Sequence, residues 1–207
     1  MIEDRKKNLK KSWLYRHRGI IMSGPLGLFY ALFLNSLLEI LPLAQWFPRY
    51  QAEIRPVMFR YPLLIGILIY GIGIPIIEEF LFRFLLFGRL RIYVSAVAAG
   101  VGSSLVFGIY HGNALQFVYA FLSGLLLCYV YWKCDSILAP ILFHGFANGF
   151  VYLIASLMGF DILQDMRQKL IACALGLAGT VLILLQMKDM KNVHSVRPEK
   201  PIFPGSV

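Results

Sequence analysis

Cysteine is scarce in this chain, and the spacing of the cysteines argues against two kinds of small cross-linked domain. Cys128, Cys134 and Cys173 are the only three among 207 residues, and no two of them have the CxxC spacing. An odd number of cysteines without CxxC pairs fits neither a disulfide framework nor a zinc knuckle. All three lie within or beside apolar runs, where a thiol packs as a small apolar side chain.

The chain also has too little polar sequence for a soluble domain. Hydrophobic residues make up 58% of it, and the mean hydropathy is +0.68, whereas soluble domains are roughly 45–50% apolar. A soluble chain of this length cannot hide several apolar runs of about 18 residues and also supply a polar surface. The composition therefore predicts a membrane protein.

The net charge of +9 is concentrated at one end. Seven of the 20 Lys and Arg residues lie in the first 18 positions, just before an apolar run. This arrangement is typical of a cytoplasmic flank that contacts anionic lipid. We therefore expect a basic cytoplasmic tail over residues 1–19, with membrane lipids as partners and no nucleic acid. The apolar run that follows lacks an obvious small-x-small cleavage site, which favours a retained span over a signal peptide.

Apolar stretches of membrane-spanning length predict an all-α, polytopic membrane helix bundle of about six to seven transmembrane helices. They fall near residues 20–42, 61–88, 93–111, 114–132, 137–157 and 169–187. The transmembrane domain thus covers residues 20–187, and residues 188–207 form a polar C-terminal tail. Gly71, Gly73 and Pro75 in the second stretch predict a kink, or two separate helices with Pro75 in the first turn of the second.

The distribution of positive charge favours six spans over seven. With six, the N-terminal tail and the C-terminal Lys and Arg residues share one side with Arg89, Arg91 and Lys133. Seven spans would place the C-terminal charges on the opposite side. We therefore expect a multi-pass protein of a prokaryotic cell (inner) membrane with both termini in the cytoplasm. The sequence shows neither an internal repeat nor a soluble domain.

Ionisable side chains inside the apolar stretches are functional candidates, because a buried charge in a bilayer costs a few kcal/mol or more unless it is paired or hydrated. Four groups qualify. They are Glu78 and Glu79 with Arg83, His111, His144 with Asn148, and Glu39.

Helical spacing assigns partners to some of these residues. Glu79 and Arg83 are four residues apart and can form an ion pair, whereas Glu78 points about 100° away and is left without that partner. His144 and Asn148 have the same spacing and share a helical face. Phe107 precedes His111 by the same interval and can pack beneath its imidazole. Helix rise permits these groups to meet in the interior of one bundle.

One carboxylate, two imidazoles and a carboxamide in a membrane cavity suit hydrolysis. The carboxylate and one histidine can deprotonate a water, while the other histidine and an asparagine donate to the oxyanion. Each residue alone also has a structural explanation, such as a packed histidine, an asparagine that joins two helices, or a supporting ion pair. The joint pattern favours the catalytic interpretation.

Three motifs in order resemble those of the CPBP family, the CAAX proteases and bacteriocin-processing enzymes that include Rce1-type glutamic intramembrane proteases. They are EExxxR at residues 78–83, FxxxH at 107–111 and HxxxN at 144–148, within a core at residues 75–150. The resemblance implies a peptidase without metal or other cofactor. It assigns water activation to Glu78 and His111, and oxyanion stabilisation to His144 and Asn148.

The same resemblance makes Glu79 and Arg83 structural. Family members often have Gly after the motif arginine, where this chain has Phe84. Rce1-like enzymes are expected to open to the cytosol, whereas the six-span arrangement puts Glu78 and His111 nearer the outer half of the bilayer. Either a different number of spans or a substrate presented from the outer face would reconcile the two.

The expected function is therefore intramembrane endopeptidase cleavage near the C-terminal or membrane-embedded part of a protein or peptide substrate. The substrate is lipidated or membrane-anchored, as in CAAX-like, sorting-signal or peptide-precursor processing. One alternative is a zinc intramembrane protease, although the chain has no HExxH sequence. Another is a non-enzyme, either a peptide-binding, immunity or scaffold protein or a small transporter that uses Glu78 as a proton carrier.

Overall fold

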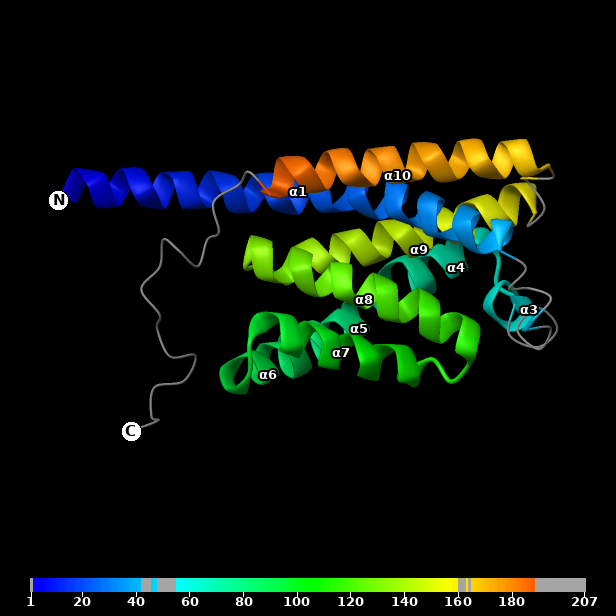
Figure 1. The fold of residues 1–207 in the computed structure, drawn as a ribbon, viewed down its shortest axis with the longest axis horizontal. Helices are drawn as coiled ribbons and strands as arrows, with labels where there is room; N and C mark the ends of the chain where they lie inside the picture. Colours follow the sequence, from blue (N-terminus) through cyan, green and yellow to red (C-terminus); the bar gives the residue numbers. More distant parts are fainter. Residues whose placement is uncertain (1, 42–45, 48–54, 160–162, 164, 189–207) are drawn as a thin grey trace.

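A computed structural model describes residues 2–41, 46–47, 55–159, 163 and 165–188, without the side chains of residues 2–12 and 55. Within these ranges every regular element is helical (Figure 1). The elements are α1 (Ile2–Ile40), α3 (Arg55–Met58), α4 (Leu63–Gly66), η2 (Ile67–Gly73), α5 (Ile74–Glu79), η3 (Phe80–Phe87), α6 (Gly88–Tyr93), α7 (Ala96–Tyr110), α8 (Ala114–Cys134), α9 (Leu138–Met158) and α10 (Met166–Lys188).

Five helical segments in the described part of the chain are long and apolar enough to cross a membrane. They are Trp13–Ile40, Leu63–Tyr93, Ala114–Cys134, Leu138–Met158 and Met166–Lys188. A sixth apolar helix, α7, has 15 residues and is shorter than the usual span. The expectation of an all-helical, multi-pass membrane protein is confirmed, with five long candidate spans where six to seven were expected. Beyond Lys188, the predicted C-terminal tail lies outside the residues that the structure describes.

The helix that begins at Leu63 continues without interruption to Tyr93, so the alternative of two separate helices is wrong. Pro75 does lie in the first turn of α5, but α5 continues directly from η2. Proline cannot donate the backbone hydrogen bond that an α-helix needs at that position. The wider π-helical turns of η2 precede it, and such turns let a helix absorb the missing bond without ending.

Small residues bring the helices into close contact. A Cβ atom at Gly176 of α10 would lie 2.4 Å from the backbone nitrogen of Phe33, so only a residue without a Cβ allows α10 to approach α1 this closely. A Cβ at Gly145 of α9 would lie 2.6 Å from the carbonyl oxygen of Gly71 in η2. These glycines allow α10 to pack closely on α1, and α9 to pack closely on the helix that contains Glu78 and Glu79.

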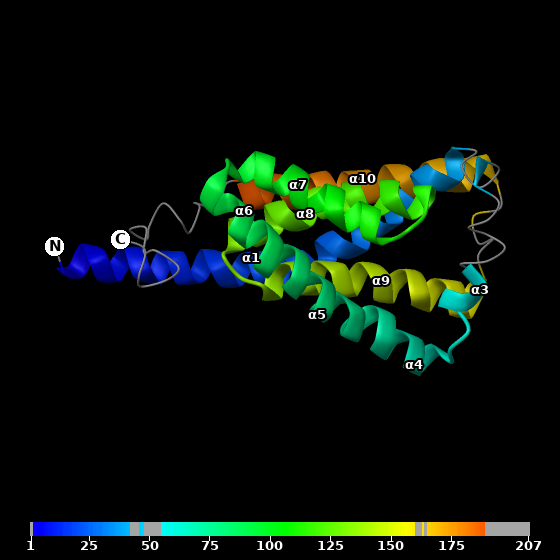
Figure 2. The same cartoon turned by 90° about the horizontal axis from the view of Figure 1, so that it is seen from below.

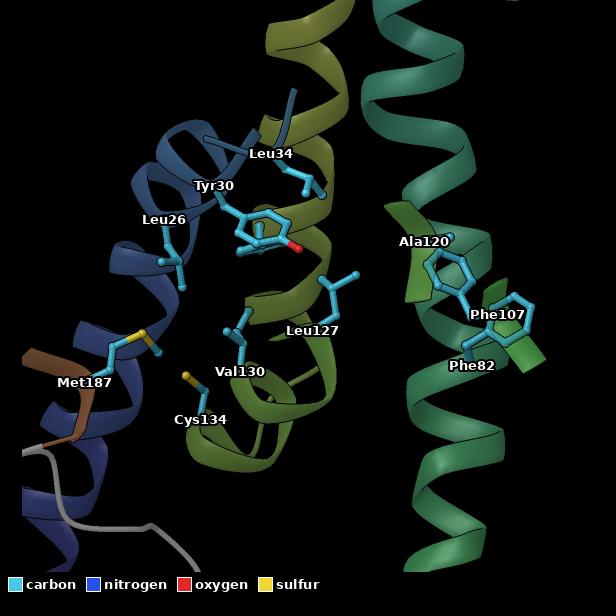
Figure 3. Close-up of a cluster of buried hydrophobic side chains, with 12 residues drawn as sticks. Leu26, Tyr30, Leu34, Phe82, Phe107, Ala120, Leu127, Val130, Cys134 and Met187 are labelled. Atoms are coloured by element: carbon cyan, nitrogen blue, oxygen red, sulfur yellow. The ribbon is translucent and has the colours of Figure 1, made fainter. Parts of the chain in front are cut away.

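The core joins α1, α8, α9 and α10, and extends to η3 and α7 (Figure 3). Leu26, Tyr30 and Leu34 enter it from α1, while Phe82 and Phe107 form an aromatic pair with centroids 4.9 Å apart. The outward faces are apolar as well, since Ile77 is 60% exposed and sits beside the buried Glu78. Buried ionisable side chains behind an apolar outer surface are the arrangement expected in lipid.

The two ends of the bundle differ in which elements they gather. The N-terminus, α6 and the last turns of α8 and α10 lie at one end, and α3 lies at the other with the start of α10 (Figures 1 and 2). At the first end, Lys133 Nζ donates to the carbonyl oxygen of Lys188 at 3.1 Å. Arg89 and Arg91 of α6 lie at that end too, so these basic residues share a side as the charge distribution predicted.

Candidate active site

The helix from Leu63 to Tyr93 turns a charged face into the bundle. Glu79 and Arg83 are fully buried and Glu78 is 8% exposed. Arg83 Nη1 donates to Glu79 Oε1 at 2.9 Å, which is the ion pair predicted from the four-residue spacing. The Arg83 guanidinium also lies 4.3 Å from the centroid of the Phe107 ring. This cation–π contact with α7 was not predicted, because the two residues are far apart in sequence.

His144 of α9 connects the two glutamates. Its Nδ1 lies 2.7 Å from Glu79 Oε1, and its Nε2 lies 3.7 Å from Glu78 Oε2. Glu79 also accepts from Arg83, and an ionised carboxylate only accepts hydrogen bonds, so Nδ1 of His144 must carry the donated hydrogen. The ring is thereby oriented with Nε2 toward Glu78.

His111 is held at the end of α7 by a second set of contacts. Its Nδ1 donates to the carbonyl oxygen of Phe107 at 2.8 Å, and the two rings meet edge to face with centroids 4.9 Å apart. The expected packing of Phe107 against His111 is therefore present, with a backbone hydrogen bond in addition. In the neutral imidazole this bond leaves Nε2 as the acceptor.

The turn after His111 fixes its position between two helices. Gly112 has a φ of 72°, and the side chain of Asn113 caps α8 by accepting from the backbone nitrogen of Gln116 at 2.9 Å. A positive φ is readily adopted by glycine, and asparagine is a favoured N-cap residue. As a result, α7 ends at His111 and α8 begins directly after the turn.

The predicted catalytic residues line one internal cavity of about 550 Å³. Glu78, His111, His144 and Asn148 all border it, and Phe107 lies against it. Asn148 follows His144 by one turn on the same face of α9, as the spacing predicted. The convergence that helix rise permitted is thus present: Glu78 meets His144 directly, and His111 and Asn148 share their cavity.

Several cavity residues were not singled out from the sequence, because uncharged residues in an apolar helix give no signal of function. Tyr70, Ser123, Gln116 and Tyr152 are examples. Glu39 also borders the cavity. Phe84, the departure from the family pattern, is 50% exposed and stacks on Phe80 with centroids 5.2 Å apart. Its ring lies on the outer face of the helix.

The donor set does not have the arrangement of a zinc site. Among the residues that the structure describes, no three His, Cys, Asp or Glu side chains gather closely enough to hold a metal ion. Nδ1 of His144 is engaged by Glu79, and Nδ1 of His111 by the Phe107 carbonyl. Each histidine therefore offers Nε2 for chemistry at the cavity.

Comparison with known proteins finds two similarities, both to membrane peptidases and both over part of the chain. Residues 60–150 match the profile described as type II CAAX prenyl endopeptidase Rce1-like. Over 80 residues the chain is 32% identical to the "Putative membrane peptidase YdiL" of Bacillus subtilis (strain 168), a match that covers 39% of this chain and 33% of that protein.

The chain thus matches about a third of the length of this curated relative, and no solved structure gives a significant match. The matched segment contains both glutamates, Arg83, both cavity histidines and Asn148. Over residues 60–150, less than half of the chain, the sequence is similar to the Rce1-like type II CAAX prenyl endopeptidases.

Proposed function

We propose that the chain is a glutamic intramembrane endopeptidase that cleaves a protein or peptide substrate near its C-terminal or membrane-embedded part. One observation carries the proposal. Glu78 is buried 3.7 Å from the His144 imidazole, in a cavity that His111 and Asn148 also line. A buried carboxylate beside two histidines and a carboxamide supplies both a base for water and donors for an oxyanion.

Water activation falls to Glu78 and His111. Glu78 has no ion pair with Arg83, whose Nη1 is bound to Glu79. His111 offers an unprotonated Nε2 because its Nδ1 donates to Phe107. Together they take a proton from a water molecule as its oxygen bonds to the carbonyl carbon of the substrate. The proton then passes to the leaving amine as the C–N bond breaks.

Oxyanion stabilisation falls to His144 and Asn148. His144 can donate from Nε2 only when both ring nitrogens carry hydrogen, because Nδ1 already donates to Glu79. In that form the two glutamates, Arg83 and His144 make an electrically neutral group. The amide of Asn148, one turn further along α9, supplies the second donor.

Glu79, Arg83 and Phe107 support these groups without contacting the substrate. Glu79 orients His144, and Arg83, whose guanidinium lies over the Phe107 ring, holds Glu79. Phe107 in turn fixes His111 through its backbone carbonyl. A single connected set of contacts therefore positions both histidines, as in sites where outer residues fix the tautomer of a functional imidazole.

The family description and the cavity both support a lipidated substrate. The matching profile is described as a CAAX prenyl endopeptidase, and the cavity lining is largely apolar. The cavity reaches the end of the bundle that holds α3 and the start of α10, opposite the basic N-terminal helix (Figure 1). With the N-terminus in the cytoplasm, the substrate enters from the outer face.

The proposal is tested by co-expressing candidate CAAX-type reporters with the chain and following their cleavage in membranes. Glu78→Gln is expected to abolish cleavage at matched protein level, since loss of a general base reduces rates by about 10²–10⁴-fold. Glu39→Gln makes the same chemical change elsewhere in the cavity and is expected to retain cleavage. Cleavage that persists in Glu78→Gln, or that a chelator removes, would contradict a glutamic mechanism.

A further inference from the structure

We infer that Lys169 is a specificity-determining residue, which binds a free carboxylate on the substrate about four residues beyond the scissile bond. The inference rests on the proposed function, since it assigns the far end of the same cavity. It concerns a residue that lies outside the segment matched by the family, residues 60–150.

The cavity is elongated along two helices. From Glu78 its lining continues through Ile74 to Tyr70, which follow one face of the helix toward α4. On α9 the lining runs from His144 through Asn148 and Val151 to Tyr152, again along one face. On both helices the lining residues extend from the reacting groups in the same direction, toward the end of the bundle where α3 lies (Figure 2).

Lys169 stands at that far end. It lies in the first turns of α10, borders the cavity and is partly buried. Among the described residues that line the cavity it is the one lysine or arginine. Glu39 from α1 and Glu78 are the acidic residues of the described lining. An ammonium group at the end of an apolar passage is suited to an anionic substrate group.

The length of the passage sets the position of that group. His144 and Tyr152 are eight residues apart, so a rise of 1.5 Å per residue separates them by about 12 Å. An extended peptide advances about 3.3 Å per residue, so this length holds about four residues. A substrate whose scissile carbonyl lies at Glu78 would then place a C-terminal carboxylate at the end of the cavity that Lys169 also borders.

The test compares two forms of one probe, a fluorescently labelled, farnesylated peptide with an apolar C-terminal sequence, made as the free acid and as the C-terminal amide. Binding to full-length Glu78→Gln is measured by anisotropy, so that turnover does not enter. The acid is expected to bind at least about tenfold more tightly than the amide, as for a hydrogen bond to a charged group. Lys169→Met is expected to remove this preference, and Lys169→Arg to restore most of it.

Arg167→Met is the matched control, because Arg167 is exposed in the same turn of α10 and does not border the cavity. It should keep the preference for the acid. Equal binding of acid and amide, no binding of either peptide, or a preference that survives Lys169→Met would each overturn the inference. A preference that depends on Lys169, without any cleavage by the wild type, would support the carboxylate site while contradicting the proposed hydrolysis.

Discussion

Two adjacent glutamates have different surroundings, and the difference assigns them different roles. Glu79 is fully buried and accepts from both Arg83 and His144. Glu78 is 8% exposed, borders the cavity and approaches His144 at 3.7 Å, beyond hydrogen-bond distance. Because Glu79 Oε1 is bound by two protein partners while the Glu78 carboxylate faces the cavity, we assign the action on water to Glu78.

Glu79→Gln is expected to destabilise the fold as well as the site. The change leaves the buried Arg83 without its carboxylate, and breaking a buried ion pair costs on the order of 3–5 kcal/mol. Thermal unfolding in detergent can be followed with a thiol-reactive dye, because Cys128 and Cys134 are 3% and 0% exposed in the folded state.

The matched control is Glu78→Gln, which removes no ion pair to Arg83 and is expected to unfold near the wild-type temperature. If Glu79→Gln were as stable as Glu78→Gln, the assignment of a supporting role to Glu79 would be wrong.

At the scale of the elements, α9 must approach the helix from Leu63 to Tyr93 closely for His144 to reach either glutamate. Gly145, the neighbour of His144, permits this approach, since its Cβ would lie 2.6 Å from the carbonyl oxygen of Gly71. Backbone contact of this kind is a common way to pack membrane helices.

Gly145→Ala is therefore expected to reduce cleavage by tenfold or more, because a displacement of about 1 Å at a catalytic group can cost about 10²-fold. The measurement is the cleavage rate in membranes at matched protein level. Gly102→Ala is the control, since its Cβ would meet the Leu90 side chain at an ordinary 3.6 Å. Equal rates for the two variants would show that close approach at Gly145 does not position the site.

The sequence predicted elements and local pairs better than contacts between elements. The six apolar stretches correspond to six helices, and the spacing of Glu79 and Arg83 predicted their ion pair. The contact of His144 with Glu79 joins residues 65 positions apart, so it depends on helix packing that no spacing rule contains.

Continuity at Pro75 was one of two alternatives that the local sequence left open, and the charge distribution favoured it. GIGIP is typical of a helix boundary, yet the π-helical turns of η2 carry the helix through it. Because the alternative helical hydrogen bonds of η2 replace those that proline disrupts, the proline marks a change of helix type here. The boundary that it usually marks does not form.

At the scale of the whole molecule, a cluster of basic residues lies at one end of the bundle, and the cavity reaches the opposite end. Basic residues of α6, α8 and α10 share one end with the N-terminal part of α1, and the cavity reaches the other end at Lys169 (Figure 1). The excess of positive charge predicts that the first end is cytoplasmic. The cavity is then expected to open to the outer face.

Single cysteines introduced at the two ends test this orientation after the three native cysteines are replaced by alanine. Tyr93 at the α6 end is 81% exposed, and Met166 at the start of α10 is 54% exposed. In intact bacterial cells, Met166→Cys should react with a membrane-impermeant maleimide, while Tyr93→Cys should react only after permeabilisation. The reverse pattern would place the cavity on the cytoplasmic side.

The central claim is that Glu78 activates water in a buried cavity. Its most direct test is the cleavage rate of a farnesylated, fluorescence-quenched peptide by purified chain in lipid vesicles, with wild type and Glu78→Gln compared at equal folded protein. We predict cleavage by the wild type, unchanged by chelator, and a loss of about 10²-fold or more in Glu78→Gln. Equal rates in the two proteins would contradict the account.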